Sequence, residues 1–152
     1  LNAALADTLP LASPGHLVAL YVLDLDGFKP VNDRYGHDVG DELLVAVAQR
    51  LRAHIRSSDL VARVGGDEFV LMATALADER AAHELGLKLC DAFVPPFVVA
   101  GEPVQVGLTA GYALAPADGR EAVALLKRAD AAMYAGKQAG KQRLVRATNM
   151  AF

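Results

Sequence analysis

The chain has 152 residues and a formal net charge of −3, and 53% of its residues are hydrophobic although only 6% are aromatic. This length fits one domain that can bury its own core without disulfides or metal clips, and the composition excludes a disordered chain. The negative charge argues against a nucleic-acid polymer as a partner, so any polyanion that binds is expected to be small.

The sequence predicts a cytoplasmic domain. The longest early apolar run, 17–23, is too short to cross a bilayer, and no positively charged signal-peptide start precedes it. The lone Cys90 has no disulfide partner, which suits a reducing compartment and a structural thiol. Because the chain starts at Leu1 rather than Met, we expect a piece of a longer protein, which could itself be membrane tethered.

The predicted elements start with a lead-in, residues 1–16, that holds a short helix and a loop of turn-forming residues. The next run, 18–24, is apolar up to Asp24, as expected of a strand covered on both faces. Helical and extended periodicities then follow one another. In chain order they predict a helix over 27–34, a helix over about 41–56, strands over 60–64 and 68–73, a helix from about 78 to the prolines at 95 and 96, strands over 97–100 and 103–114, a helix from about 122, and a strand over 143–145.

This order of elements predicts the fold class. It consists of one strand, two helices, a strand pair, a helix, a second strand pair, a helix and a last strand. The order favours a mainly antiparallel sheet surrounded by helices. The class is α+β, with a ferredoxin-like or palm-type sheet. We assign residues 17–147 to this domain and 148–152 to a C-terminal tail.

The hairpin tip at 65–68 carries the most information about function. Gly65 and Gly66 can take the positive φ angles of a tight turn and let a bulky anionic ligand approach the backbone. Asp67 and Glu68 follow them, where a divalent cation could bridge the carboxylates to phosphate oxygens. An ordinary hairpin with solvated acids is the simpler interpretation of these four residues taken alone.

A third carboxylate changes that interpretation. Asp24 ends the strand over 18–24, and if this strand lies beside the hairpin, Asp24, Asp67 and Glu68 share one spot. Like charges so close disfavour joint ionisation unless a cation compensates, so the cluster predicts one or two Mg²⁺ ions bound with the phosphates of a substrate. Two such ions suit phosphoryl or nucleotidyl transfer.

Several motifs, in order and at matching spacing, resemble the diguanylate cyclase family, whose GGDEF domain is named after such a turn. The resemblance runs from about residue 17 to residue 146. It rests on Asp24-Leu25-Asp26-Gly27-Phe28-Lys29, Asn32-Asp33, Gly36-His37, Gly40-Asp41, Gly65-Gly66-Asp67-Glu68-Phe69, Ala129-Asp130-Ala131-Ala132-Met133-Tyr134, Lys137 and Gly140-Lys141.

The resemblance implies a bacterial signalling enzyme that condenses two GTP molecules into cyclic di-GMP and releases pyrophosphate. The family works as a homodimer whose two half-sites face each other, each holding one GTP and two Mg²⁺ or Mn²⁺ ions. It also implies a sensor or regulatory domain upstream in the full-length protein. GTP and cyclic di-GMP are therefore the expected small-molecule partners.

By position in the motifs, four residues would bind the metals: Asp24, the backbone carbonyl of Leu25, Asp67 and Glu68. Glu68 is also a candidate to assist deprotonation of the attacking 3′-hydroxyl. For Asp26, capping of the following helix is at least as good an interpretation as any chemistry.

Asn32 and Asp41 match the pair that contacts guanine in the family. The chemistry agrees, because a carboxylate can accept from guanine N1 and N2 while a side-chain amide completes the purine edge. Another nucleotidyl cyclase on a similar sheet is an alternative function. The retained Asn32 and Asp41 favour guanine, because adenine offers no such donor pair.

Lys137 and Lys141, one turn apart near the end of the last helix, match the family's basic residues for the β- and γ-phosphates. The backbone amides of Gly27 and Phe28, with Lys29 beside them, could supplement them. A solvated basic helix end is the alternative interpretation of the two lysines.

Arg56 and Asp59 match the Arg-x-x-Asp inhibitory site of the family at the expected offset from Gly65. Arginine reads the O6/N7 edge of guanine and aspartate accepts from N1 and N2, so the pair suits the product cyclic di-GMP. Feedback inhibition follows as a hypothesis. The alternative is an exposed ion pair of little energetic worth.

The chain departs from the family pattern without losing a predicted ligand. The usual opening signature Asp-x-Leu-Thr-Gly-Leu-x-Asn-Arg is missing, Gly136 replaces the usual Ala, Gln142 replaces a frequent Asn, and Thr109 replaces the commoner Ser. A regulatory module that binds GTP or cyclic di-GMP without catalysis is the main alternative function.

Overall fold

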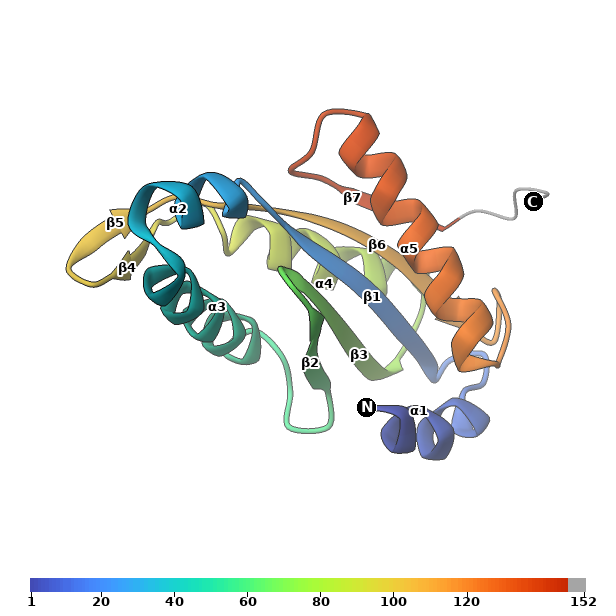
Figure 1. Ribbon diagram of the computed structural model, residues 1–152. Coiled ribbons are helices and arrows are strands. Elements are labelled where there is room, and N and C mark those ends of the chain that lie inside the picture. Colours follow the sequence, from blue (N-terminus) through green and yellow to red (C-terminus); the bar gives the residue numbers. More distant parts are fainter. Residues whose placement is uncertain (148–152) are drawn as a thin grey trace.

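A five-stranded sheet with helices on both faces forms the centre of the computed structural model, which describes residues 1–147 (Figure 1). The strand order is β2-β3-β1-β6-β7, and every pair is antiparallel except β6 with β7. The strands are β1 (Leu17–Asp26), β2 (Leu60–Gly65), β3 (Glu68–Leu76), β6 (Gly107–Ala115) and β7 (Leu144–Arg146), with β4 (Phe97–Val99) and β5 (Glu102–Val104) in a separate hairpin. The helices are α1 (Asn2–Thr8), the 3₁₀ turn η1 (Leu9–Leu11), α2 (Phe28–Tyr35), α3 (His37–Arg52), α4 (Glu79–Asp91) and α5 (Ala122–Gln138).

The central strand β1 separates two hydrophobic cores. Its odd-numbered residues from Ala19 to Leu25 pack with α3 and α4, and its even-numbered residues from Val18 to Val22 pack with α1 and α5. Successive side chains of a strand point to opposite faces. Asp24 and Asp26, the even-numbered acids at the end of β1, therefore belong to the face that α5 covers.

The predicted fold class is confirmed, and most predicted elements are present. The long helix predicted over 41–56 instead spans His37–Arg52, because the chain breaks at Gly36, whose φ of 90° lets a new helix start at once. The tail predicted over 148–152 lies outside the described residues.

The strand predicted over 103–114 is wrong, because this segment forms two strands in different sheets. β5 pairs with β4, whereas β6 pairs with β1. Between them the Gln105 side chain donates a hydrogen bond of 2.8 Å to the carbonyl of Phe93, which holds the chain where it passes from one sheet to the other. An alternating apolar pattern cannot reveal a change of sheet, since both strands continue the same period.

The β2–β3 hairpin closes through a two-residue turn. Gly65 pairs with Glu68, so the turn consists of Gly66 and Asp67. Only Gly66 has a positive φ, 46°, whereas Gly65 ends β2. The expectation that both glycines would take positive φ angles is therefore correct for Gly66 alone.

Small residues let α5 lie directly on β6. A Cβ atom at Gly111 would stand 2.2 Å from the Ala129 carbonyl oxygen, which means that helix backbone and strand backbone are in contact. Near the other end of α5, a Cβ at Gly136 would lie 2.9 Å from the Thr109 methyl carbon and 3.1 Å from a Val145 methyl carbon. Thr109 and Gly136, the two residues that depart from the family pattern, are therefore neighbours. The Thr109 methyl fills the space that an alanine at 136 would need.

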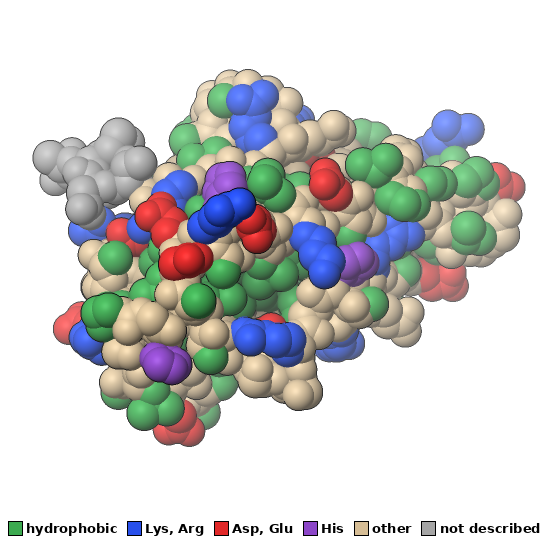
Figure 2. Space-filling view, turned by 180° about the vertical axis from the view of Figure 1, so that it is seen from behind, with side chains coloured by type: hydrophobic (Ala, Val, Ile, Leu, Met, Phe, Trp, Pro, Cys, Tyr) green, Lys and Arg blue, Asp and Glu red, His purple; other side chains and the backbone are tan. Residues whose placement is uncertain are grey.

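Among the described residues, no helix has both the length and the apolar character that a bilayer span requires. On the face that carries α4, acidic, basic and hydrophobic side chains are interspersed (Figure 2). A surface of this kind attracts neither a polyanion nor a polycation strongly.

We predict that Gly136→Ala and Thr109→Ser are strongly coupled. In the wild-type background the new Cβ overpacks against Thr109, which should cost about 1–3 kcal/mol and cancel the gain of about 1 kcal/mol from replacing a helical glycine. In the Thr109→Ser background the closest of these contacts is gone, while carbons of Val145 and Arg143 remain 3.1 Å and 3.3 Å from the new Cβ, so the same change should cost less than in the wild type. Urea unfolding of the four proteins in this double-mutant cycle measures the coupling, and additive effects would contradict the packing argument.

Candidate active site

The candidate site lies where the end of β1, the tip of the β2–β3 hairpin and the end of α5 meet. Asp24 pairs in register with Glu68 of β3 on one side and with Thr109 of β6 on the other. Residues directly opposite each other in an antiparallel pair share a face, so these three side chains lie in one row across the sheet. The turn residue Asp67 is held next to them, because its carbonyl accepts a hydrogen bond of 3.2 Å from the Leu25 amide.

Asp24 has a carboxylate oxygen free to bind a cation. Its Oδ1 is buried and has no hydrogen-bond partner, and its Oδ2 stands 3.6 Å from the Lys137 ammonium. Burial raises the pKa of Asp24 to about 6; the Lys137 charge opposes the shift, and the Asp67 and Glu68 carboxylates add to it. Since an unpaired buried acceptor is costly, a hard cation is the species that would satisfy it.

Glu68 is the second acid with a perturbed environment. Burial raises its pKa, and the carboxylates of Asp130 on α5 and of Asp67 raise it further. In the part of the chain that the structure describes, no three acidic, histidine or cysteine side chains form a ready group for a metal ion. The structure thus brings the three predicted acids together at one end of the neighbouring strands β1 and β3, but it does not assemble them into a metal cage.

Lys137 places its ammonium group at the end of β1. Its Nζ donates to the Leu25 carbonyl at 3.0 Å and to Asp26 Oδ1 at 2.6 Å. The Leu25 carbonyl is one of the oxygens predicted to bind a metal, so a cation already contacts it in the form of this lysine. The site is therefore built to hold positive charge.

The helix-capping interpretation of Asp26 is wrong. Gly27 is the N-cap of α2 and no side chain caps this helix. Asp26 is only 6% exposed and instead accepts hydrogen bonds from Thr109, Lys137 and the backbone amide of Gln142. The pleat of β1 explains this, because it turns Asp26 toward α5 and the loop after it. Neither Asp26 nor Thr109 was assigned to the predicted site from the sequence, although the even spacing of Asp24 and Asp26 was a usable signal.

The two predicted phosphate-binding lysines are not on one helix. α5 ends at Gln138, and Lys141 lies in the following loop with a φ of 66°. Its amide donates to the Gly136 carbonyl at 3.0 Å, which turns the chain back toward β7. The spacing of four residues suggested continued helix, but Gly140, with a φ of 123°, has already broken it.

The start of α2 offers backbone donors on the same side of the molecule. Gly27 has a φ of 87°, and no side chain accepts from the first amides of the helix, which begins at Phe28. Lys29, in the first turn, is exposed. Free amides at a helix start attract anionic groups, so all three residues remain candidates for phosphate contacts.

Gly40, noted from the sequence only as part of a motif, is next to Asp41 in the chain and in contact with Asn32. The Asn32 amide packs on Gly40 so closely that a Cβ there would lie 1.7 Å from Asn32 Oδ1, a buried atom without a hydrogen-bond partner. Asp41 lines a cavity of about 430 Å³ between α3 and the hairpin, which Arg63 and Phe69 also border. Gly40, directly before Asp41, thus leaves the space that the Asn32 amide occupies.

Arg56 and Asp59 form a structured loop at the start of β2. Asp59 is buried, at 2% side-chain exposure, and accepts from the backbone amides of Arg56 at 2.9 Å and Thr74 at 3.0 Å. The half-exposed Arg56 guanidinium donates to Asp59 and to the Thr74 carbonyl, beside a cavity of about 320 Å³ that Arg52 also lines. Asp59 therefore holds Arg56 in place, which an exposed ion pair would not do.

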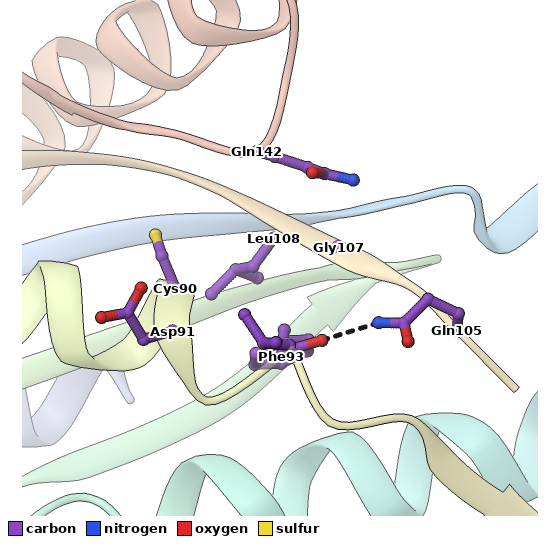
Figure 3. Close-up of a pocket in the computed structure, with 8 residues that line it drawn as sticks. Cys90, Asp91, Phe93, Gln105, Gly107, Leu108 and Gln142 are labelled. Carbon is purple, nitrogen blue, oxygen red and sulfur yellow. Dashed lines mark hydrogen bonds between the residues drawn. The ribbon is translucent and has the colours of Figure 1, made fainter. Parts of the chain in front are cut away.

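A further cavity of about 340 Å³ borders the site behind Gln142 (Figure 3). The Gln142 side chain lies over Gly107, while Cys90, Phe93 and Leu108 line the opposite part. Burial raises the pKa of the Cys90 thiol to about 11, which agrees with the predicted structural role.

We predict that Asp24→Asn raises the free energy of unfolding near neutral pH when divalent cations are absent. The pKa of Asp24 rises from 3.8 to about 6 on folding, so the wild-type carboxyl costs stability progressively as the pH increases from about 4 to about 6. The advantage of the variant should grow across this window and stay level above it. Because the side chain keeps 22% exposure, the gain should be on the order of 1 kcal/mol.

Urea unfolding at about pH 4, 6 and 7.5 measures this dependence. Asp33→Asn is the matched control, because Asp33 is an exposed acid on α2 and should show no such window. A gain for Asp24→Asn that is the same at all three pH values would contradict the prediction.

Known proteins resemble most of the chain. Residues 1–143 match the family described as "Diguanylate cyclase, GGDEF domain". The chain is 46% identical over 123 residues to the bifunctional diguanylate cyclase/cyclic di-GMP phosphodiesterase MucR of Pseudomonas aeruginosa, a match that covers 81% of this chain and 18% of MucR. The chain thus spans less than a fifth of that relative.

Solved structures share the fold. The GGDEF domain of PA1120 (YfiN or TpbB) from Pseudomonas aeruginosa is 36% identical, with a TM-score of 0.88 over 97% of this chain and 91% of that one. The GGDEF domain of DgcB from Caulobacter crescentus, in complex with c-di-GMP, is 28% identical, with a TM-score of 0.71 over 97% and 85% of the two chains. The family match over residues 1–143 and the shared fold show that the chain belongs to the diguanylate cyclase family and has the GGDEF domain fold.

Proposed function

We propose that this domain condenses two GTP molecules into cyclic di-GMP with release of pyrophosphate. The observation that carries the proposal is the end of β1, where Asp24 has a buried carboxylate oxygen without a hydrogen-bond partner close to Asp67 and Glu68, and Lys137 supplies a cation over the same strand end. This arrangement can bind metal and triphosphate together. The name of the relative MucR, a bifunctional diguanylate cyclase, supports the same reaction.

The acids fit divalent cations. Asp24, the Leu25 carbonyl, Asp67 and Glu68 would hold two Mg²⁺ or Mn²⁺ ions per half-site, since all four offer the oxygen donors that hard cations prefer. When bound, such ions neutralise phosphate charge and polarise the phosphoryl group under attack. Glu68, with its raised pKa, is placed in the role of proton acceptor for the 3′-hydroxyl.

The remaining residues bind and orient GTP. Asn32 and Asp41 recognise the guanine edge next to the cavity between α3 and the hairpin. Lys137 and Lys141 contact the β- and γ-phosphates, and the free amides at the start of α2 add backbone donors. The unpaired Asn32 oxygen supports this assignment, because a buried polar atom is expected to find a partner in the liganded state.

Catalysis requires two copies of the domain. Each site holds one GTP, and joining two nucleotides needs a second site that faces the first, so the active species is a homodimer. The domain, residues 17–147, would work in the cytoplasm under the control of a sensor or regulatory domain elsewhere in a longer protein, in line with the small share of MucR that it covers.

We predict that Asp67→Ala combined with Glu68→Ala abolishes cyclic di-GMP synthesis while the fold is retained. Both residues lie at the hairpin tip, where truncation leaves the two hydrophobic cores untouched. The purified domain is incubated with GTP and Mg²⁺ at a concentration high enough to force dimerisation, and the nucleotides are separated and identified by mass. Turnover should fall at least about a hundredfold.

Asp33→Ala is the control, because this exposed acid lies outside the proposed machinery. Residual cyclic dinucleotide synthesis in the double variant would refute the metal assignment. GTP binding without product in the wild type would instead favour the alternative function, a regulatory module that binds GTP or cyclic di-GMP without catalysis.

We also propose that cyclic di-GMP inhibits the enzyme at Arg56 and Asp59. The Arg56 guanidinium is half-exposed beside the cavity that Arg52 lines, and two backbone amides hold the buried Asp59 beneath it. In this arrangement Arg56 reads the O6/N7 edge of the product guanine and Asp59 positions it. A GGDEF domain bound to c-di-GMP, that of DgcB, is among the similar structures, which supports product binding by this fold.

We expect Arg56→Ala to weaken cyclic di-GMP binding at least about tenfold, because a charged hydrogen-bond donor to the guanine is lost. Titration calorimetry with cyclic di-GMP measures the affinity, and Arg80→Ala, an exposed arginine on α4, is the control. Unchanged affinity in Arg56→Ala would remove the proposed inhibitory site and leave the proposed catalytic site unaffected.

A further inference from the structure

We propose that Asp26, held by Thr109, is a positioning residue that sets Lys137 and the Lys141 loop for the triphosphate of GTP. The inference rests on the proposed function, because it concerns how the two phosphate-binding lysines come to their places. It starts from one buried carboxylate whose contacts reach two separate parts of the chain.

Both carboxylate oxygens of Asp26 have hydrogen-bond donors from the protein, which distinguishes it from Asp24. Oδ1 accepts from the Thr109 hydroxyl at 2.9 Å and from Lys137 at 2.6 Å. Oδ2 lies 2.8 Å from the Thr109 oxygen and accepts from the Gln142 amide at 2.9 Å. Asp24 instead keeps a buried oxygen without a partner. The two even-numbered acids of β1 thus have different tasks: Asp24 can bind a cation from solution, and Asp26 can bind only what the protein supplies.

Thr109 determines which groups donate and which accept in the hydrogen bonds around Asp26. Its side chain is completely buried, and its oxygen accepts a hydrogen bond of 3.0 Å from the Gln142 amide. The hydroxyl proton is therefore free to be donated to Asp26, which accepts only. A buried carboxylate needs such fixed donors, since an unpaired one would be expelled or protonated.

The same network anchors the loop that carries Lys141. Gly140, Lys141 and Gln142 have φ angles of 123°, 66° and 48°, three successive residues in a region that side chains rarely adopt. Backbone of this kind persists only where its surroundings hold it. The Gln142 amide, bound to both Asp26 and Thr109, supplies that hold directly after Lys141.

One carboxylate therefore places both lysines, Lys137 through an ion pair and Lys141 through the backbone of its loop. When phosphates replace the contacts of Lys137 with Leu25 and Asp24, the bond to Asp26 keeps the ammonium at the end of β1. Charge that is already in position costs little to organise when the triphosphate arrives. The guanine site, between α3 and the hairpin, does not depend on this network.

The test compares a triphosphate with a monophosphate. Titration calorimetry with Mg²⁺ measures the affinity of the α,β-methylene analogue of GTP and of GMP for the wild type, Thr109→Val, Thr109→Ser, Asp26→Asn and Lys137→Met. Thr109→Val keeps the volume and removes the hydroxyl, whereas Thr109→Ser keeps the hydroxyl and is the matched control. We expect Thr109→Val to weaken the triphosphate analogue about tenfold and to leave GMP within about twofold.

Asp26→Asn, which preserves shape but not charge, should give the same selective loss and keeps the test valid if Thr109→Val unfolds. Equal losses for GMP and the triphosphate analogue, in either variant, would mean a merely structural role and overturn the inference. If Lys137→Met weakens binding of the triphosphate analogue but Thr109→Val and Asp26→Asn do not, the inference about Asp26 is overturned and the proposed phosphate site stands. No weakening in Lys137→Met would overturn the proposed phosphate site and the inference together.

Discussion

β1 is paired on both edges, and its pleat sends every second side chain to the face that α5 covers. This alternation is the constraint on which the site depends. It buries Leu23 and Leu25 in the core with α3 and α4, and it turns Asp24 and Asp26 toward α5. A shift of the strand by one residue would exchange the two faces and bury the acids among leucines and valines.

The acids at this end of β1 differ in whether their carboxylate oxygens are still free to bind a further donor or a cation. Asp26 accepts hydrogen bonds from a hydroxyl, an amide and an ammonium of the protein, and it behaves as part of the scaffold. Asp24 and Glu68 have raised pKa values because burial and neighbouring carboxylates disfavour their charge, and one Asp24 oxygen has no partner. Perturbed acids next to a satisfied one are typical of a site that stays incomplete until a ligand brings positive charge.

The close contact between α5 and β6 determines where Lys137 enters the site. Gly111 brings the two backbones together, and Gly136 with Thr109 sets the spacing at the residue directly before Lys137, which is still within α5. A bulkier residue at either glycine would move the helix away from the strand and carry the ammonium with it. The departures from the family pattern at 109 and 136 thus compensate each other in packing, which sequence comparison of either position alone would not reveal.

The sequence by itself determined the local features: the hairpin tip, the strand that carries Asp24 and the order of the motifs. These depend on turn chemistry and on side-chain period, which act over a few residues. Only the tertiary structure decided that Asp26 binds Lys137 and the loop after α5 instead of capping α2, that Lys141 lies outside α5, and that the segment 103–114 divides between two sheets. Each of these depends on distant contacts; Thr109 is 83 positions from Asp26, and Gln142 is 116 positions away. No local pattern encodes such contacts, because they exist only when the sheet and α5 have come together.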